Sequence, residues 1–283
     1  MKGVGGVREL PGRALAGAIT AGLLLATACQ PPPGQEAARP PGPLLVSAAS
    51  SLQEPLRALA PLLAQQRQRR QPPQFNLGSS GSLKQQIERG APVDVFIAAG
   101  DQPIHQLAEK GLLLAGSRRA IASNQLVLVV PARSPNRSLS FQGLGSNRIR
   151  RIGIGDSTVP AGDYGRQTLA YFKLSAVVSP KLVPMGSVRA VAQAVATGAV
   201  EAGLVYGSDA LNVANLRISA VAPPHSHAPI TYLAAVVASS RQPHEARALV
   251  QALTTPQAQE EFRRHGLLAP APPAAPAPKE TKP

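Results

Sequence analysis

Residues 44–54 read LLVSAASSLQE, an apolar run that passes directly into two serines and then into an amphipathic segment. The run at 44–49 has the length of a buried strand, and the apolar positions of 52–66 recur at helical spacing. Ser51 and Glu54 have the spacing of a capping box, in which two side chains satisfy backbone N–H groups at a helix start. A strand that leads at once into a helix is the repeating unit of an α/β fold.

The same alternation of short apolar runs and longer amphipathic runs continues along the chain. Further strands are expected at 75–77, 94–98, 125–130, 151–155, 202–206 and 230–238. Further helices are expected at 83–89, 102–110, 161–173 and 187–197, with two more within 243–266. Alternating strands and helices favour mostly parallel sheets flanked by helices, and two such series lie on either side of the β-rich run QLVLVV. The sequence therefore predicts two α/β lobes, which we name lobe I (44–124 and 225–268) and lobe II (125–224).

The two ends of the chain differ in composition from this body. Residues 1–28 hold three basic residues, then an apolar run, and end in LATA directly before Cys29. A basic start followed by a short apolar run is typical of a signal peptide, and LATAC resembles a bacterial lipobox, in which the cysteine is acylated. We therefore expect a lipoprotein signal peptide at 1–28, an acylated Cys29 that anchors the exported chain to the membrane, and a Pro-rich tether at 29–43. The Ala/Pro-rich stretch 269–283 is expected to be a disordered tail.

The chain has 283 residues and a formal net charge of +14, with 44% hydrophobic and 3% aromatic residues. The apolar share is sufficient for a globular core, which excludes a wholly disordered chain. A large positive charge is a feature of nucleic-acid-binding proteins. The basic residues are scattered, however, and the densest run, RQRR at 67–70, falls at an expected helix end, where cations suit the helix dipole. Few aromatic rings are available to stack on bases, so nucleic-acid binding is disfavoured.

Polar residues gather where the expected strands end and the helices begin. These junctions are SSLQE (50–54), GSSGS (78–82), DSTVPAGDY (156–164), MGSV (185–188) and YGSD (206–209). In open α/β sheets, ligands bind beyond the carboxyl ends of the strands, where helix N-termini present free N–H groups. Pro160 fits the first position of its helix, so we expect the N–H groups of Ala161 and Gly162 to be unpaired. Each serine alone could simply cap its helix, but the five junctions together indicate an anion-binding site.

With these motifs, 44–268 resembles the molybdate-binding proteins of ABC transporters, a family of periplasmic type II solute-binding proteins. The matching segments are AASSL (48–52), GSSGSL (78–83), QIERGAPVDVFIAA (86–99), VPAGDY (159–164) and VYGSDA (205–210). The resemblance implies a two-lobed fold whose interlobe cleft closes on molybdate by hydrogen bonds alone. The contacts it implies are the hydroxyl and N–H of Ser51, a hydroxyl of Ser79 or Ser80, the N–H groups of Ala161 and Val188, and the Tyr206 hydroxyl. Ser80 is preferred to Ser79 because it directly precedes the expected helix start.

The same resemblance implies a periplasmic, monomeric protein that works with a permease and its ATPase and needs no cofactor. An enzyme is not expected, because GSSGS lacks the final glycine of G-x-S-x-G and no Walker lysine is present. The segment His225-Ser226-His227 could hold a metal, but no cysteine or carboxylate cluster accompanies it, so no metal site is expected. Tungstate and sulfate stay open as alternative ligands, because the sequence does not reveal the radius of the cavity.

Overall fold

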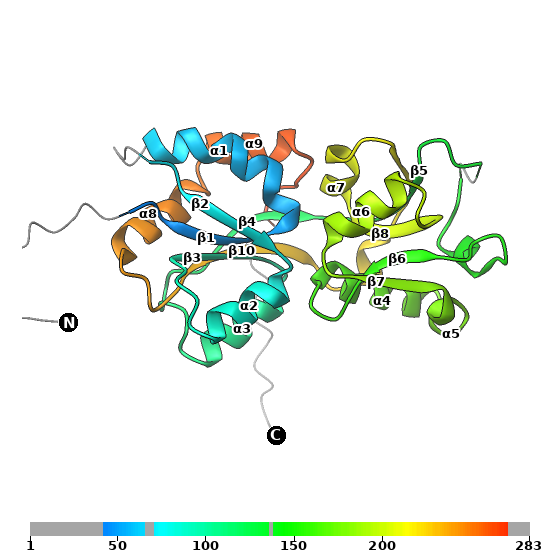
Figure 1. Cartoon of the computed structure of the whole chain (residues 1–283), viewed down its shortest axis with the longest axis horizontal. Coiled ribbons are helices and arrows are strands. Elements are labelled where there is room, and N and C mark those ends of the chain that lie inside the picture. Colours follow the sequence, from blue (N-terminus) through cyan, green and yellow to red (C-terminus); the bar gives the residue numbers. More distant parts are fainter. Residues whose placement is uncertain (1–41, 66–70, 136–137, 271–283) are drawn as a thin grey trace, which may run out of the picture. The chain divides into compact units, whose positions relative to one another are not determined.

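The computed structural model describes residues 42–65, 71–135 and 138–270 (Figure 1). The expected signal peptide, Cys29, nearly all of the tether, the RQRR run and 271–283 lie outside the described residues. Within the described ranges, no helix is long and apolar enough to cross a membrane.

Lobe I contains a five-stranded sheet in the order β2-β1-β3-β10-β4. The strands are β1 (Leu45–Ala49), β2 (Gln74–Gly78), β3 (Val95–Ala99), β4 (Arg119–Asn124) and β10 (Ile230–Val236). Strands β2, β1 and β3 are parallel, and β10 is antiparallel to both β3 and β4. The helices of this lobe are η1 (Ser50–Leu52), α1 (Gln53–Gln65), α2 (Ser80–Glu88), α3 (Asp101–Glu109), α8 (Pro243–Ala252) and α9 (Pro256–Arg264).

Lobe II contains a second five-stranded sheet, in the order β7-β6-β8-β5-β9. The strands are β5 (Leu126–Pro131), β6 (Ile152–Gly155), β7 (Leu182–Met185), β8 (Ala202–Tyr206) and β9 (Leu216–Val221). Strands β7, β6 and β8 are parallel, and β5 is antiparallel to β8 and β9. The α-helices are α4 (Pro160–Tyr171), α5 (Ser175–Val178), α6 (Val188–Ala196) and α7 (Gly207–Asn212), and short 3-10 turns are η2 (Gln142–Gly145), η3 (Ser179–Lys181) and η4 (Pro224–Ser226).

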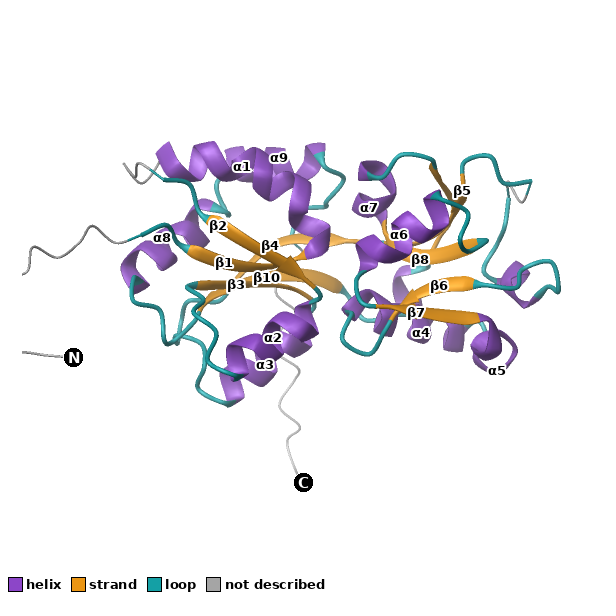
Figure 2. Cartoon of the chain, viewed as in Figure 1, coloured by secondary structure: helices purple, strands orange, loops and turns teal. Residues whose placement is uncertain are grey.

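Two mixed sheets flanked by helices confirm the predicted α/β, two-lobed fold (Figure 2). Every antiparallel pairing includes β5 or β10, and the chain passes between the two sheets from β4 to β5 and from β9 to β10. Residues 126–130 of β5 are fully buried, which explains why this run is so uniformly apolar in the sequence.

Three strands that the sequence did not predict, β4, β7 and β9, are all at the edge of a sheet. Edge strands have one unpaired side and are less completely buried, so they need neither a continuous apolar run nor a clean alternation. Strand β4 begins with an exposed arginine, β7 contains Pro184, and β9 has no buried residue. The local pattern in these strands is therefore too weak to distinguish them from loops.

Candidate functional site

Four helix starts lie on the two sides of the junction between the lobes. η1 and α2 follow β1 and β2 of lobe I, whereas α4 and α6 follow β6 and β7 of lobe II (Figure 2). Helix α6 contacts η1, and the Gly81 N–H at the start of α2 donates to the Thr158 carbonyl, just before α4, at 2.9 Å. N–H groups in a first helical turn lack a carbonyl one turn earlier, so a junction built from several helix starts suits an anion.

The six residues expected to contact an anion are all buried, each at 5% exposure or less. Ser51 lies in η1, Ser79 is the N-cap and Ser80 the first residue of α2, Ala161 is the second residue of α4, Val188 is the first residue of α6, and Tyr206 ends β8. The fold therefore places each of them at a helix start or strand end beside the lobe junction. Their role as ligand contacts stays a prediction.

The two serines at the start of α2 make different contacts. The Ser79 hydroxyl caps α2 by accepting the Ser82 N–H at 3.2 Å, and it lies 2.9 Å from the Thr158 hydroxyl of lobe II. The Ser80 hydroxyl accepts the Ala99 N–H at 3.0 Å, which leaves its own proton for another acceptor. Helix α2 starts at Ser80, three residues earlier than expected, so Ser80 is its first residue and does not precede it. These contacts favour Ser80 as the anion donor and Ser79 as a contact between the lobes.

The start of α4 corrects one expectation about free N–H groups. Pro160 is the first residue of α4, as expected. The Gly162 N–H, which we expected to be unpaired, donates to the Val159 carbonyl at 2.8 Å. This contact is a tight 3-10-type bond, which is frequent at helix ends. The carbonyl three residues before Ala161 belongs to Thr158 and accepts from Gly81, so Ala161 remains the candidate N–H donor of this turn.

The capping box expected from Ser51 and Glu54 is not formed. Ala49 is the N-cap of η1, and no side chain makes a cap hydrogen bond there. The Glu54 carboxylate instead accepts from the Arg189 guanidinium of α6 at 2.8 Å, an ion pair between the two lobes. Because Arg189 directly follows Val188, this ion pair holds the start of α6 against the start of α1.

A group of hydroxyls surrounds Ser51. The Ser51 and Tyr232 hydroxyls are 2.8 Å apart, and Asn124 donates from Nδ2 to the Tyr232 hydroxyl at 3.1 Å. The Tyr206 ring packs edge-on against the Tyr232 ring, with centroids 6.0 Å apart. The Tyr206 hydroxyl is buried, yet it has no hydrogen-bond partner among the described residues. A buried polar group without a partner costs about 1–3 kcal/mol, so this hydroxyl is the strongest single indication of a ligand acceptor.

Burial also raises the pKa values of two side chains of lobe II, Tyr206 and Asp209. Burial raises the pKa of Tyr206 well above its usual value, so its hydroxyl keeps its proton and remains a donor. Burial raises the pKa of Asp209, in the first turn of α7, to about 7, against the opposing effect of the Arg189 charge. Both carboxylate oxygens of Asp209 lack a hydrogen-bond partner within the described part of the chain. A carboxyl in this position is therefore a neutral acid up to about neutral pH.

Two cavities open at the lobe junction. The larger, about 730 Å³, is lined by residues at the starts of α3 and α4, including Asp101, Tyr164 and Arg166. The smaller, about 260 Å³, lies between α2, α3 and α4. Neither cavity is lined by any of the six candidate residues, all of which are buried. A Cβ added at Gly81 would lie 2.5 Å from the Thr158 carbonyl oxygen, so only glycine allows the lobes to approach so closely here.

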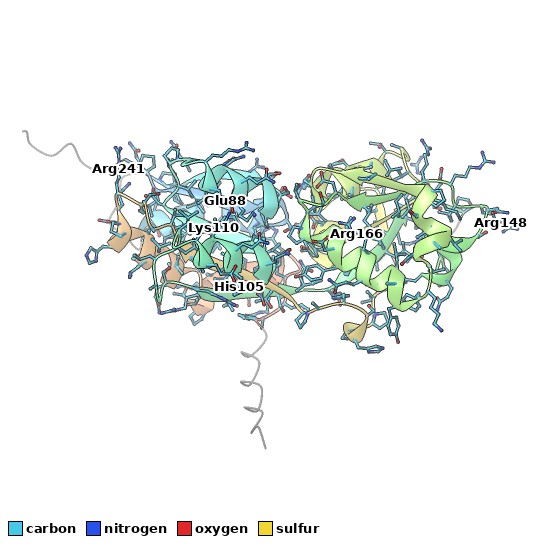
Figure 3. All side chains as sticks on the ribbon, turned by 90° about the horizontal axis from the view of Figure 1, so that it is seen from below. Glu88, His105, Lys110, Arg148, Arg166 and Arg241 are labelled. Atoms are coloured by element: carbon cyan, nitrogen blue, oxygen red, sulfur yellow. The ribbon has the colours of Figure 1, made fainter. Side chains whose placement is uncertain are left out.

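The cationic side chains of the surface are not concentrated at the six candidate residues. Arg148 and Arg241 lie at opposite ends of the described body, and Arg166 lies on lobe II (Figure 3). The Arg166 guanidinium donates to the Gly155 and Asp156 carbonyls and to the Asp163 carboxylate, so it braces the loop that leads into α4. The hydrogen bonds made by the Ser51, Ser79 and Ser80 hydroxyls involve neutral groups.

The histidines of the HSH segment point to different partners. His225 Nε2 lies 2.8 Å from the Tyr171 hydroxyl, and His227 Nδ1 lies 2.7 Å from the Ala228 carbonyl oxygen. Across the described ranges, no group of three or more His, Cys, Asp or Glu residues could hold a metal ion.

Sequence reasoning missed Tyr232, Asn124 and Thr158. Tyr232 falls inside an expected strand and Asn124 at the end of an edge strand that was not expected, so neither stands in a polar junction. Thr158 was part of a quoted motif, but its contact with α2 spans 79 residues of sequence. The missed residues are therefore those whose partners come from distant elements.

Residues 44–268 match the family described as bacterial extracellular solute-binding protein. The chain belongs to this family. Three proteins that are similar to this chain carry names that describe substrate binding or molybdate binding, and none of the three names describes an enzyme.

Two relatives resemble this solute-binding protein over about two thirds of its length. YvgL of Bacillus subtilis (strain 168), named as an ABC transporter substrate-binding lipoprotein, is 34% identical over 196 residues, which is 69% of this chain and 75% of the relative. Molybdate-binding protein ModA of Escherichia coli (strain K12) is 32% identical over 196 residues, which is 68% of this chain and 76% of the relative. The solved periplasmic molybdate-binding protein of Azotobacter vinelandii superimposes with a TM-score of 0.72 at 26% identity, covering 81% of this chain and 100% of that chain.

Proposed function

We propose that this solute-binding protein captures molybdate at the junction of its lobes and delivers it to the permease and ATPase of an ABC importer. The observation that carries the proposal is the set of buried, neutral donors at this junction, above all the unpartnered Tyr206 hydroxyl in the described structure. The Ser51 and Ser80 hydroxyls and the N–H groups of Ala161 and Val188 complete the set. Similarity to proteins named for molybdate supports this choice of anion.

Neutral donors can bind a dianion tightly if several act together. A hydrogen bond to a charged acceptor contributes about 1.5–3 kcal/mol, so five such bonds give on the order of 10 kcal/mol before the costs of association. Micromolar affinity requires about 8 kcal/mol net, so such a set reaches it only at the upper end of this range and with donors that are held in place before the anion binds. The number and direction of donors then select the anion, while the positive surface raises its local concentration.

Tungstate and sulfate are the competing ligands, because both carry two negative charges on four oxygens and differ from molybdate mainly in electronic structure or size. Thermal unfolding with molybdate, tungstate, sulfate and phosphate at millimolar concentration separates them. A ligand present at about 1,000 times its dissociation constant should add roughly 4 kcal/mol to the free energy of unfolding. We expect this with molybdate or tungstate. No shift with either would reject the proposal, and a largest shift with sulfate would support the alternative.

Ser51→Ala tests the site itself. We expect it to weaken molybdate binding at least several-fold, because it removes a hydroxyl donor while the fold remains intact. Ser146→Ala, which changes an exposed serine near Arg148, is the matched control and should bind like the unchanged protein. Unchanged affinity in Ser51→Ala would remove Ser51 from the site.

We also propose that Cys29 is acylated and that the mature protein is an exported, periplasmic monomer held at a membrane by the tether 29–43. The lipobox-like segment and the name of the Bacillus subtilis relative support this location. Cys29→Ser should move the protein from the membrane fraction to the soluble fraction. Its persistence at the membrane would contradict acylation.

A further inference from the structure

The orientation of the Asn124 side chain is fixed by its backbone neighbour. Asn124 Oδ1 accepts the Gln125 N–H at 2.9 Å, so Nδ2 must face the other way. From there Nδ2 donates to the Ser208 hydroxyl of lobe II at 2.8 Å and to the Tyr232 hydroxyl at 3.1 Å. Both amide protons are used, and Asn124 is 7% exposed. Asn124 thus acts as a donor, and not as an acceptor, toward Tyr232.

This donation determines what the Tyr232 hydroxyl does. Tyr232 is fully buried, and burial raises the pKa of Tyr232, so its hydroxyl carries a proton. The oxygen already accepts from Asn124, and its other hydrogen-bond neighbour is the Ser51 hydroxyl at 2.8 Å. Donation from Tyr232 to Ser51 gives the Tyr232 oxygen one accepted and one donated hydrogen bond, and gives the Ser51 oxygen one accepted hydrogen bond. The Ser51 proton is then left to point away from Tyr232, toward whatever occupies the lobe junction.

We propose that Asn124 and Tyr232 are positioning residues that orient the Ser51 hydroxyl as a donor to the bound oxyanion. Without this relay, the Ser51 hydroxyl could donate to Tyr232 and present an oxygen lone pair to the anion, which would repel it. The inference rests on the proposed oxyanion function. It adds two residues that do not touch the anion and act on it through Ser51.

The other serine of lobe I is arranged in the same way. The Ala99 N–H, which can only donate, occupies one lone pair of the Ser80 hydroxyl at 3.0 Å. Both serine hydroxyls of lobe I therefore accept a hydrogen bond from the protein and keep their protons for a ligand. A site whose hydroxyls all donate suits an oxyanion that carries no proton of its own. Hydrogen phosphate, whose proton requires an acceptor, is disfavoured.

A double-mutant cycle with molybdate tests the relay. Tyr232→Phe removes the hydroxyl and keeps the ring, and we expect it to weaken molybdate binding about three- to tenfold. In the Ser51→Ala background, the same substitution should change the affinity by less than about 1.5-fold, because the group that it positions is absent. Equal losses in both backgrounds, or no loss in either, would overturn the relay. Tyr171→Phe, which removes a half-exposed hydroxyl bonded to His225, is the control and should have no effect.

Asn124→Asp provides a second test if Tyr232→Phe fails to fold. The carboxylate can only accept, so Tyr232 would donate to it and the polarity of the relay would reverse. We expect a greater loss of molybdate affinity than in Tyr232→Phe, together with a smaller preference for molybdate over phosphate. The exposed Asn147→Asp is the matched control for added charge. If the unchanged protein does not bind molybdate, the proposed function fails. If it binds and Asn124→Asp binds equally well, only the relay fails.

Discussion

The lobe I side of the junction keeps its hydroxyls hydrogen-bonded to the protein, whereas the lobe II side leaves two buried polar side chains without a partner among the described residues. Ser51 is paired with Tyr232, and Ser80 accepts from Ala99. On the lobe II side, the Tyr206 hydroxyl and both oxygens of Asp209 are unpartnered in the part of the chain that the structure describes. The lobe I hydroxyls are thus oriented before an anion binds. The lobe II side carries an energetic cost, and a bound oxyanion can relieve the part that comes from the unpartnered Tyr206 hydroxyl.

The largest expected effect comes from Asp209. With a pKa raised from 3.8 to about 7, the folded protein retains a proton between these pH values that the unfolded chain has lost. Raising the pH from 4 to 8 therefore favours unfolding, by about 4 kcal/mol in total, and the effect levels off above about pH 8. Asp209→Asn abolishes this contribution. Measured by urea unfolding, its stability relative to the unchanged protein should grow by about 4 kcal/mol from about pH 4 to about pH 8.

The exposed Asp101→Asn is the control for this pH series, because its carboxylate is in contact with solvent in the folded and unfolded states. It should show no comparable growth. If the stability difference between Asp209→Asn and the unchanged protein is constant over this pH range, the buried Asp209 carboxyl does not carry the energetic cost that is assigned to lobe II.

An effect of intermediate size is expected for Tyr206→Phe. We expect this substitution to raise the stability of the ligand-free protein and to lower the affinity for molybdate. Removal of an unpartnered buried hydroxyl should stabilise the ligand-free protein by about 1 kcal/mol. The same change should weaken molybdate binding at least about tenfold, since a charge-assisted hydrogen bond is lost. Thermal unfolding without ligand and calorimetric titration provide the two values.

Ser51→Ala is the corresponding change on lobe I. We expect it to lower both the stability of the ligand-free protein and the affinity for molybdate, because Tyr232 loses its acceptor. If Tyr206→Phe and Ser51→Ala change stability and molybdate affinity in the same directions, the contrast between the lobes is wrong.

The smallest effect is expected for the ion pair that joins the two halves. Arg189 and Glu54 are 21% and 30% exposed, and such partly exposed pairs contribute less than about 1 kcal/mol. Glu54→Gln should accelerate molybdate dissociation by at most several-fold and leave the association rate unchanged, with a smaller difference at high salt. Stopped-flow measurements test this. Glu260→Gln, which alters ion pairs within α9 alone, should leave both rates unchanged.

The fold was largely predictable because its central strands and most of its helices have strong local patterns. The run at 126–130 is apolar throughout because β5 lies between β8 and β9 and is buried on both faces. The edge strands β4, β7 and β9 were missed because partial exposure allows charged residues and proline in them. The serine-rich junctions were also visible, since a strand end followed by Ser and Gly is a local feature.

The partners of those polar groups could not be predicted. The capping box read from Ser51 and Glu54 was wrong because Arg189, 135 residues away, competes for the Glu54 carboxylate. The expected free N–H of Gly162 was wrong because the turn before Pro160 brings the Val159 carbonyl within reach. In both cases the sequence indicated which groups could bond, and the geometry of the folded chain decided which bonds formed.

The alternation of strands and helices, the two-lobed α/β class and the places where hydroxyls meet helix starts follow from local sequence. These properties depend on hydrophobic periodicity and on capping preferences, which act over a few residues. Long-range folding, in contrast, brings Tyr232 within hydrogen-bond distance of Ser51, 181 residues away in sequence, and places Asn124 in contact with both lobes. Such contacts arise from the order of strands in the sheets, which local sequence patterns do not encode.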